Sequence, residues 1–176
     1  LDTGVFSQID PLTTAFPSIA VMGAFCDGYF IVLQAHSGKF FISELENGST
    51  SGWAALDVAQ VSESSNRISA MLVDHRRVYL FGQLTTERWY NSGYANFPFQ
   101  PDQDGFMEHG ILAPYSAVQL DPSVYWLGAN AQGGGVAYRM TSGGASRIST
   151  HAIEATWATY GAMTNAIGWS YQEQGH

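Results

Sequence analysis

Cysteine, lysine and long apolar runs are scarce in this sequence, and each shortage excludes a class of protein. Cys26 is the only cysteine, so an intramolecular disulfide and a thiolate metal cluster are both excluded. Within an apolar run, that side chain is expected to be a small buried hydrophobe. The longest apolar stretch runs from Ile19 to Cys26, far short of the roughly twenty residues that cross a bilayer. We therefore expect no membrane span, and a fold stabilised by packing and backbone pairing.

Positive charge is also scarce. Charged residues make up 12% of the chain, with fifteen Asp and Glu against seven Lys and Arg, and Lys39 is the only lysine. Proteins that grip a nucleic-acid backbone carry a basic stripe that neutralises phosphates, and this chain has none. We therefore expect no sequence-specific nucleic-acid binding. The hydrophobic content of 45% is sufficient for one compact domain.

Metal-ligand patterns are weak. No two of the five histidines have the i, i+4 spacing that places two imidazoles on one metal. PDQDGFMEHG at 101–110 offers Asp102, Asp104 and Glu108 as oxygen ligands for calcium, but it lacks the twelve-residue loop of an EF-hand. A turn rich in Asp and Gly explains this segment without an ion. We predict no metal and no cofactor.

Sequence signals of catalysis are also missing. No Gly-x-Ser-x-Gly elbow occurs, and the Gly133–Gly135 run is not followed by a phosphate-binding lysine. We therefore predict no catalytic residue and no enzyme. One alternative stays open, a propeller glycoside hydrolase or carbohydrate-binding module, which would need carboxylates converging on a central channel.

An internal repeat organises the chain. FCDGYFIVLQ at 25–34, LVDHRRVYLFGQ at 72–83 and QLDPSVYWLGAN at 119–130 align, with Asp27, Asp74 and Asp121 at equal steps of 47 residues. Each unit begins with an alternating apolar strand that ends at the Asp turn, and a second strand rich in β-branched and aromatic residues follows. A third strand comes next, at Lys39–Ser43, Thr86–Tyr90 and Gly135–Met140. More polar closing segments, 51–60 and 146–154, complete the first and third units.

Four short antiparallel strands in 40 to 50 residues is the period of a β-propeller blade. We predict a single all-β domain over 1–176, propeller-like, with three four-stranded blades at about 19–65, 66–112 and 113–165. The start of a fourth unit is expected at 166–176. Because a ring needs at least about four blades, we expect an open fragment of a longer propeller. A β-sandwich is the alternative architecture, and Thr150–Met163 is compatible with either a helix or a strand.

The segment RVYLFGQLTTERWYNSG at 77–93 places charges beside aromatic residues. Alternation along the third strand of its unit predicts that Glu87 and Trp89 face one way, and that Arg88 and Tyr90 face the other. An outer blade strand explains this pattern, and a docking surface is the alternative, because aromatic residues with arginine are typical interface anchors.

The sequence from residue 77 onward resembles that of a known protein family. VYLFGQLTTERWYNSG, FPFQPDQDGFMEHGILAPYSAVQLDPSVYWLGANAQGGGVAYR, RISTHAIE and GWSYQEQGH occur in order, and the earlier FFISELENGSTSGWAALDVAQVSES is similar too. They resemble the packaged-DNA stabilisation proteins of lambdoid short-tailed phages, also called head-completion or tail-hub proteins. Members of that family are longer, so the chain is expected to be an internal part of a larger protein.

The resemblance implies a structural virion protein with no catalytic residues. Such proteins form a homo-oligomeric ring below the portal, close or extend its channel after packaging, retain the DNA and seat the tail needle. The implied partners are portal or adaptor proteins and the tail needle, and the implied location is the tail connector of the virion, after synthesis in the bacterial host cytoplasm. Four aromatic residues are our interface candidates, contacting a neighbouring subunit or blade: Trp89, Tyr94, Phe97 and Phe99.

Overall fold

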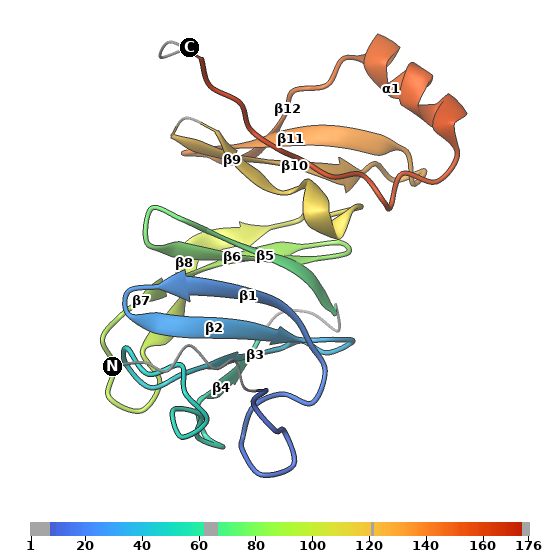
Figure 1. Ribbon diagram of the computed structural model, residues 1–176. Coiled ribbons are helices and arrows are strands. Elements are labelled where there is room, and N and C mark those ends of the chain that lie inside the picture. Colours follow the sequence, from blue (N-terminus) through green and yellow to red (C-terminus); the bar gives the residue numbers. More distant parts are fainter. Residues whose placement is uncertain (1–7, 62–66, 121, 174–176) are drawn as a thin grey trace.

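The computed structural model describes residues 8–61, 67–120 and 122–173, in which three four-stranded antiparallel sheets dominate. The first sheet comprises β1 (Ala20–Cys26), β2 (Tyr29–Gln34), β3 (Lys39–Ile42) and β4 (Val58–Gln60). The second comprises β5 (Ile68–Asp74), β6 (Arg77–Gly82), β7 (Thr86–Asn91) and β8 (Phe99–Met107). The third comprises β9 (Val118–Leu120), β10 (Ser123–Ala129), β11 (Gly135–Thr141) and β12 (Gly144–Arg147). Figure 1 shows the sheets stacked face to face, as propeller blades are, so the predicted all-β architecture of three blades is confirmed.

The middle sheet is buried on both faces, which explains its unbroken apolar strand. In β6, Val78 and Leu80 pack into a core shared with the first sheet. Tyr79 and Phe81 point the other way, into a core shared with the third sheet. Because successive strand residues face opposite sides, a strand between two sheets needs apolar residues at every position. Cys26 belongs to the first core, as predicted, and its burial raises the pKa of the thiol to about 11.

The hairpin turns correct one detail of the repeat. Asp27 has φ 51° and lies in the first turn, whereas Asp74 is the last residue of β5 and pairs with Arg77. His75 and Arg76 have positive φ and form the second turn, which matches the two positive φ values of a type I′ hairpin turn. The residue pairs that close the three hairpins are 26 with 29, 74 with 77, and 120 with 123. Their first residues are therefore 48 and 46 positions apart. The equal aspartate spacing therefore does not mark equivalent positions, and Asp121 lies outside the described residues.

The closing segments of the first and third units are shorter strands than predicted. Within 51–60 only Val58–Gln60 is a strand. In the third unit β12 ends at Arg147, and α1 (His151–Trp157) follows where the closing strand was expected to continue. Thr150 caps this helix by accepting a hydrogen bond from the backbone N–H of Ile153. Thr150–Met163 is therefore helical from 151 to 160, through α1 and a 3₁₀ turn at Ala158–Tyr160.

Charge links α1 to β12. Arg147 forms an ion pair with Glu154, and the Ser149 hydroxyl donates to the same carboxylate at 2.5 Å. Both contacts favour the ionised form, so the pKa of Glu154 lies below its ordinary value.

We expect α1 to loosen in acid. A lowered pKa in the folded state contributes stability above the ordinary carboxyl pKa, and that stability is lost as the pH falls through the lowered value. Amide hydrogen exchange of 151–157 should therefore accelerate, relative to the sheets, at pH values below about 4. The Glu154→Gln variant should show faster exchange already at neutral pH and a weaker response to acid. Identical pH responses of α1 in the two proteins would contradict this assignment.

The segment after α1 returns along the third sheet. Its contacts include a backbone hydrogen bond from Gly168 to the carbonyl of Tyr115 at 2.9 Å. Residues 161–173 carry no strand assignment, so the start of a fourth unit at 166–176 stays a prediction, and 174–176 lie outside the described residues. In the described part of the chain, no helix has the length and apolar character that a membrane span requires.

Candidate functional site

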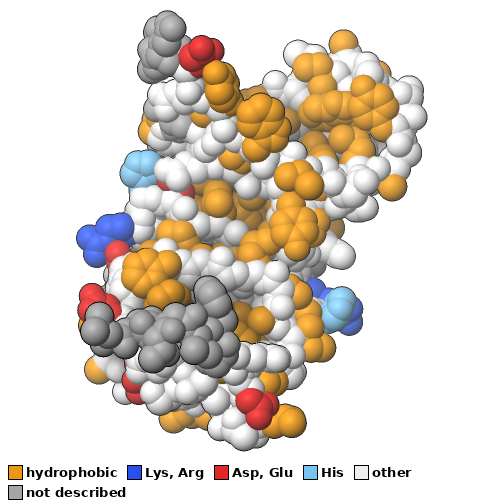
Figure 2. Space-filling model, in the orientation of Figure 1, with side chains coloured by type: hydrophobic (Ala, Val, Ile, Leu, Met, Phe, Trp, Pro, Cys, Tyr) orange, Lys and Arg blue, Asp and Glu red, His pale blue; other side chains and the backbone are white. Residues whose placement is uncertain are grey.

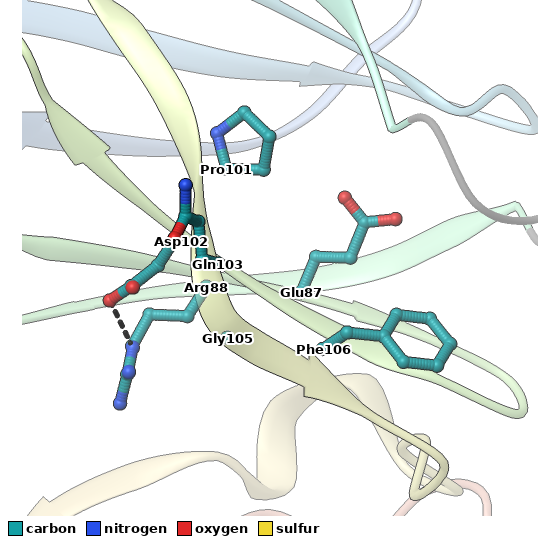
Figure 3. A pocket seen from close by; sticks show the side chains of 7 residues that line it. All are labelled: Glu87, Arg88, Pro101, Asp102, Gln103, Gly105 and Phe106. Carbon is teal, nitrogen blue, oxygen red and sulfur yellow. Dashed lines mark hydrogen bonds and ion pairs between the residues drawn. The ribbon is translucent and has the colours of Figure 1, made fainter.

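One hollow over the middle sheet arises where β8 bulges away from β7. Trp89 lies opposite Pro101 and Glu87 lies opposite Phe106, so residues 102–105 face Arg88 alone. Such a bulge breaks the ladder and opens the sheet locally. The resulting β7–β8 hollow has a volume of about 310 Å³. Its lining, drawn in Figure 3, is Glu87, Arg88, Pro101, Asp102, Gln103, Gly105 and Phe106.

Gly105 makes the bulge possible. A Cβ at this position would approach the Cβ and the carbonyl oxygen of Arg88 to 2.8 Å, which is closer than real side chains come. A glycine within a strand often marks a bulge for this reason.

Glu87 forms the floor of the hollow. Its side chain is only 3% exposed, and its Oε2 accepts a hydrogen bond from the indole Nε1 of Trp89 at 3.0 Å. The predicted shared face of Glu87 and Trp89 is thus confirmed. A buried carboxylate requires hydrogen-bond donors, and the indole supplies one of them.

Arg88 points to the opposite side of β7, as predicted. Its Nε donates to Oδ2 of Asp102 at 2.9 Å, and the Nε of Arg77 lies 3.6 Å from the same oxygen. The Arg77 guanidinium also lies over the ring of Tyr90. Tyr79 lies beside Arg88 and is buried, and this burial raises the pKa of its phenol. These contacts fasten the bulge to the sheet.

Both carboxylates of the hollow serve the fold. Glu87 accepts from Trp89, and Asp102 is held by two arginines, while the ring of Phe106 is half-exposed. No nucleophile with an adjacent base occurs among the seven lining residues. Asp102 supports the bulge through Arg88 and Arg77, and within the described ranges no three His, Cys, Asp or Glu side chains converge as a metal site.

The four interface candidates fall into two groups. Trp89 and Phe99 are 5% and 1% exposed, and their rings contact Phe40 and Tyr29 of the first sheet. Phe97 is partly buried and also packs against Phe40. These three rings contact the neighbouring blade, which is one of the two kinds of contact predicted for them. Tyr94 is 66% exposed, so its predicted contact with another subunit stays a prediction.

Sequence analysis missed the β7–β8 hollow. The available signal was Gly105 inside a segment that pairs as a strand, which we interpreted as part of an Asp- and Gly-rich turn. The Arg88–Asp102 pair had no signal of its own, because fourteen residues separate its members and only the bulge brings them together.

Comparison with known proteins agrees with this architecture. A search of curated proteins gives no match. A comparison with protein families, in contrast, matches residues 17–176 to a phage stabilisation family described as bacteriophage P22 Gp10, beta-propeller. The match spans all three sheets, α1 and the segment that follows it. This chain therefore belongs to that family of phage structural, DNA-stabilising β-propeller proteins.

Proposed function

We propose that the protein containing this chain is a structural component of the connector between portal and tail. In this proposal it closes or extends the portal channel after packaging, retains the DNA and seats the tail needle. It acts as a homo-oligomeric ring on portal or adaptor proteins in the virion, without catalytic activity. The observation that carries the proposal is the family match over residues 17–176, a family of DNA-stabilising phage proteins.

Exposed apolar side chains on the first sheet support the proposal that further blades flank this chain. Phe25 and Phe30 are 53% and 41% exposed, although they occupy the two strands that are otherwise the core of a blade. In the rest of the stack, the corresponding strand faces are covered by the next sheet. An additional sheet would cover these residues in the same way.

Net charge supports a channel protein that does not hold DNA. The chain has a formal net charge of −8, and five of its six arginines hydrogen-bond or ion-pair with described side chains. A wall with few available cations adds little salt-sensitive affinity for phosphates. Packaged DNA can then move past it at ejection. The alternative of a glycoside hydrolase gains no support from the β7–β8 hollow, because its carboxylates serve Trp89 and two arginines.

The proposal can be tested with the full-length parent protein and the portal of the same phage. The protein should form a ring on isolated portal complexes, visible by electron microscopy. Filled heads that lack the protein should release DNA, measured with an intercalating dye, and addition of the protein should stop the release. Absence of portal binding together with unchanged DNA release would reject the proposal.

Within this assembly, we expect Tyr94 to contribute to a protein contact. Because exposed tyrosines at interface centres often act as anchors, the Tyr94→Ser variant should weaken ring or portal assembly by about 10-fold or more. Tyr160→Ser is the matched control, since Tyr160 has nearly the same exposure of 63%. Both variants should unfold at the same temperature as the parent. Equal assembly of the two variants would exclude Tyr94 as an anchor.

A further inference from the structure

A second hollow lies where all three sheets meet, at the end from which β1 and β5 start. It has a volume of about 370 Å³. The first sheet contributes the start of β1 and the turn after β2, the second sheet the start of β5 and the turn after β6, and the third a 3₁₀ turn (Pro114–Ser116) before β9. Its lining, here called the three-sheet hollow, is Val21, Met22, Ala35, His36, Arg67, Ile68, Ser69, Gln83, Pro114 and Tyr115.

The three-sheet hollow is basic in an acidic protein. Arg67 and His36 line it, and its ten lining residues within the described part of the chain include no Asp or Glu. Figure 2 shows that Lys, Arg and His side chains are few on the face drawn, whereas apolar side chains are widespread on it. The local field therefore favours a negatively charged group, although the formal net charge of the chain is −8.

Arg67 differs from the other arginines of the chain. Arg76, Arg77, Arg88 and Arg147 pair with carboxylates, and Arg139 donates to Ser123. Among the described residues, Arg67 has no hydrogen-bond or ion-pair partner, and its side chain is exposed. The planar guanidinium of an arginine can donate two parallel hydrogen bonds to one carboxylate. Arg67 can therefore bind a carboxylate in this way.

The other lining residues indicate which class of anion fits the hollow. Val21, Met22 and Pro114 are apolar, whereas Ser69 and Gln83 offer hydrogen-bond donors. The Tyr115 ring is 62% exposed at the rim. A phosphate backbone would require a series of cations along its path, and the described lining supplies one arginine. One carboxylate beside an apolar side chain matches a single arginine next to an apolar wall.

We propose that the three-sheet hollow binds an acidic peptide segment of another protein, with a Glu or Asp carboxylate held by Arg67 and an apolar neighbour seated against Val21 and Pro114. Aromatic and apolar walls around one arginine are the composition of an interface anchor site. The site lies at the meeting point of three blades, so it exists only in the assembled stack. The inference depends on the hollow itself and not on the assignment of the parent protein to the portal.

The test uses the isotope-labelled chain and the blocked peptide acetyl-Leu-Glu-Leu-amide, with acetyl-Leu-Gln-Leu-amide as the uncharged probe. The Glu peptide should shift the NMR signals of the Arg67 guanidinium and of the backbone around Ser69 and Gln83. It should bind at least about 10-fold more tightly than the Gln peptide, because a hydrogen bond to a charged group is lost with the Gln peptide.

Arg67→Gln should reduce that preference to about 1-fold, whereas Arg76→Gln should leave it unchanged, since exposed Arg76 is already paired with Asp27 at 2.7 Å. The amide spectra of both variants verify that the sheets are intact. Equal binding of the two peptides, or an unchanged preference in Arg67→Gln, would overturn the proposal. Tighter binding of a short DNA duplex than of the Glu peptide, lost in Arg67→Gln, would overturn it in favour of a phosphate site.

Discussion

Replacing Phe40 by alanine lowers the free energy of unfolding by about 3–5 kcal/mol, the range for large-to-small changes at buried aromatic positions. Phe40 is fully buried between the first and second sheets. Its ring makes edge contacts with Trp89 and Phe97, with centroid distances of 5.1 and 5.8 Å. The variant loses the transfer free energy of the ring and both aromatic contacts, and it leaves a cavity at the junction of two blades. Urea unfolding followed by tryptophan fluorescence measures the loss.

Phe106→Ala is the matched control for this measurement. Phe106 is 42% exposed on β8 and has a solvent-facing ring, so its removal should cost no more than about 1 kcal/mol. A loss of no more than about 1 kcal/mol in Phe40→Ala as well would mean that the contact between the first two sheets contributes little to stability.

A second large effect is expected at Gly110, which passes close to the turn after β6. A Cβ at this position would come within 2.5 Å of the carbonyl oxygen of Gly82 and would also overlap the backbone of Gln83. The neighbouring Ile111 N–H donates to the same Gly82 carbonyl at 2.8 Å, so the two segments cannot separate without loss of this hydrogen bond. Because the obstacle is backbone, Gly110→Ala should destabilise the protein by up to about 3 kcal/mol.

Gly143→Ala provides the comparison. A Cβ at Gly143 would meet nothing within 4 Å, so the substitution should change stability by no more than about 0.5 kcal/mol. Thermal unfolding followed by circular dichroism distinguishes the two variants. If Gly110→Ala also unfolds at the parent temperature, the close approach between 110 and the turn at 82–83 is not a feature of the folded protein.

Gly110 also reports on the contact between the second and third sheets. Its carbonyl oxygen accepts a hydrogen bond from Nε1 of Trp126, at 3.2 Å, and Trp126 is nearly fully buried. A displaced 110 backbone would therefore leave a buried indole N–H without its acceptor. We expect the near-ultraviolet signal of the tryptophans to change in Gly110→Ala even below the unfolding transition.

The interface candidates show what an alternating strand pattern can predict and what it cannot. Alternation correctly predicted that Glu87 and Trp89 share a face, because side-chain direction in a strand is a local property. It could not predict whether that face meets solvent, a partner or another sheet. The structure places Trp89 and Phe99 against the first sheet and leaves Tyr94 exposed.

The two hollows are harder to predict from the sequence than the strands are. The β7–β8 hollow depends on a bulge, where three extra residues of β8 face a short stretch of β7. The three-sheet hollow collects side chains from positions 21 to 115. Neither has a short motif, because each is formed by the ends and irregularities of strands that only the stack brings together.

The sequence by itself determined the strands, their grouping into three units and the family, since each depends on short-range alternation and on a repeated order of segments. Tertiary structure alone decided which apolar residues meet between sheets, that the hairpin turns follow steps of 48 and 46 residues instead of the aspartate spacing, and that Arg67 has no described partner beside a hollow. The physical reason is that pairing within a strand hairpin is local. Stacking of one sheet on the next joins residues that are distant in the chain, and it is decided by shape and burial over the whole interface.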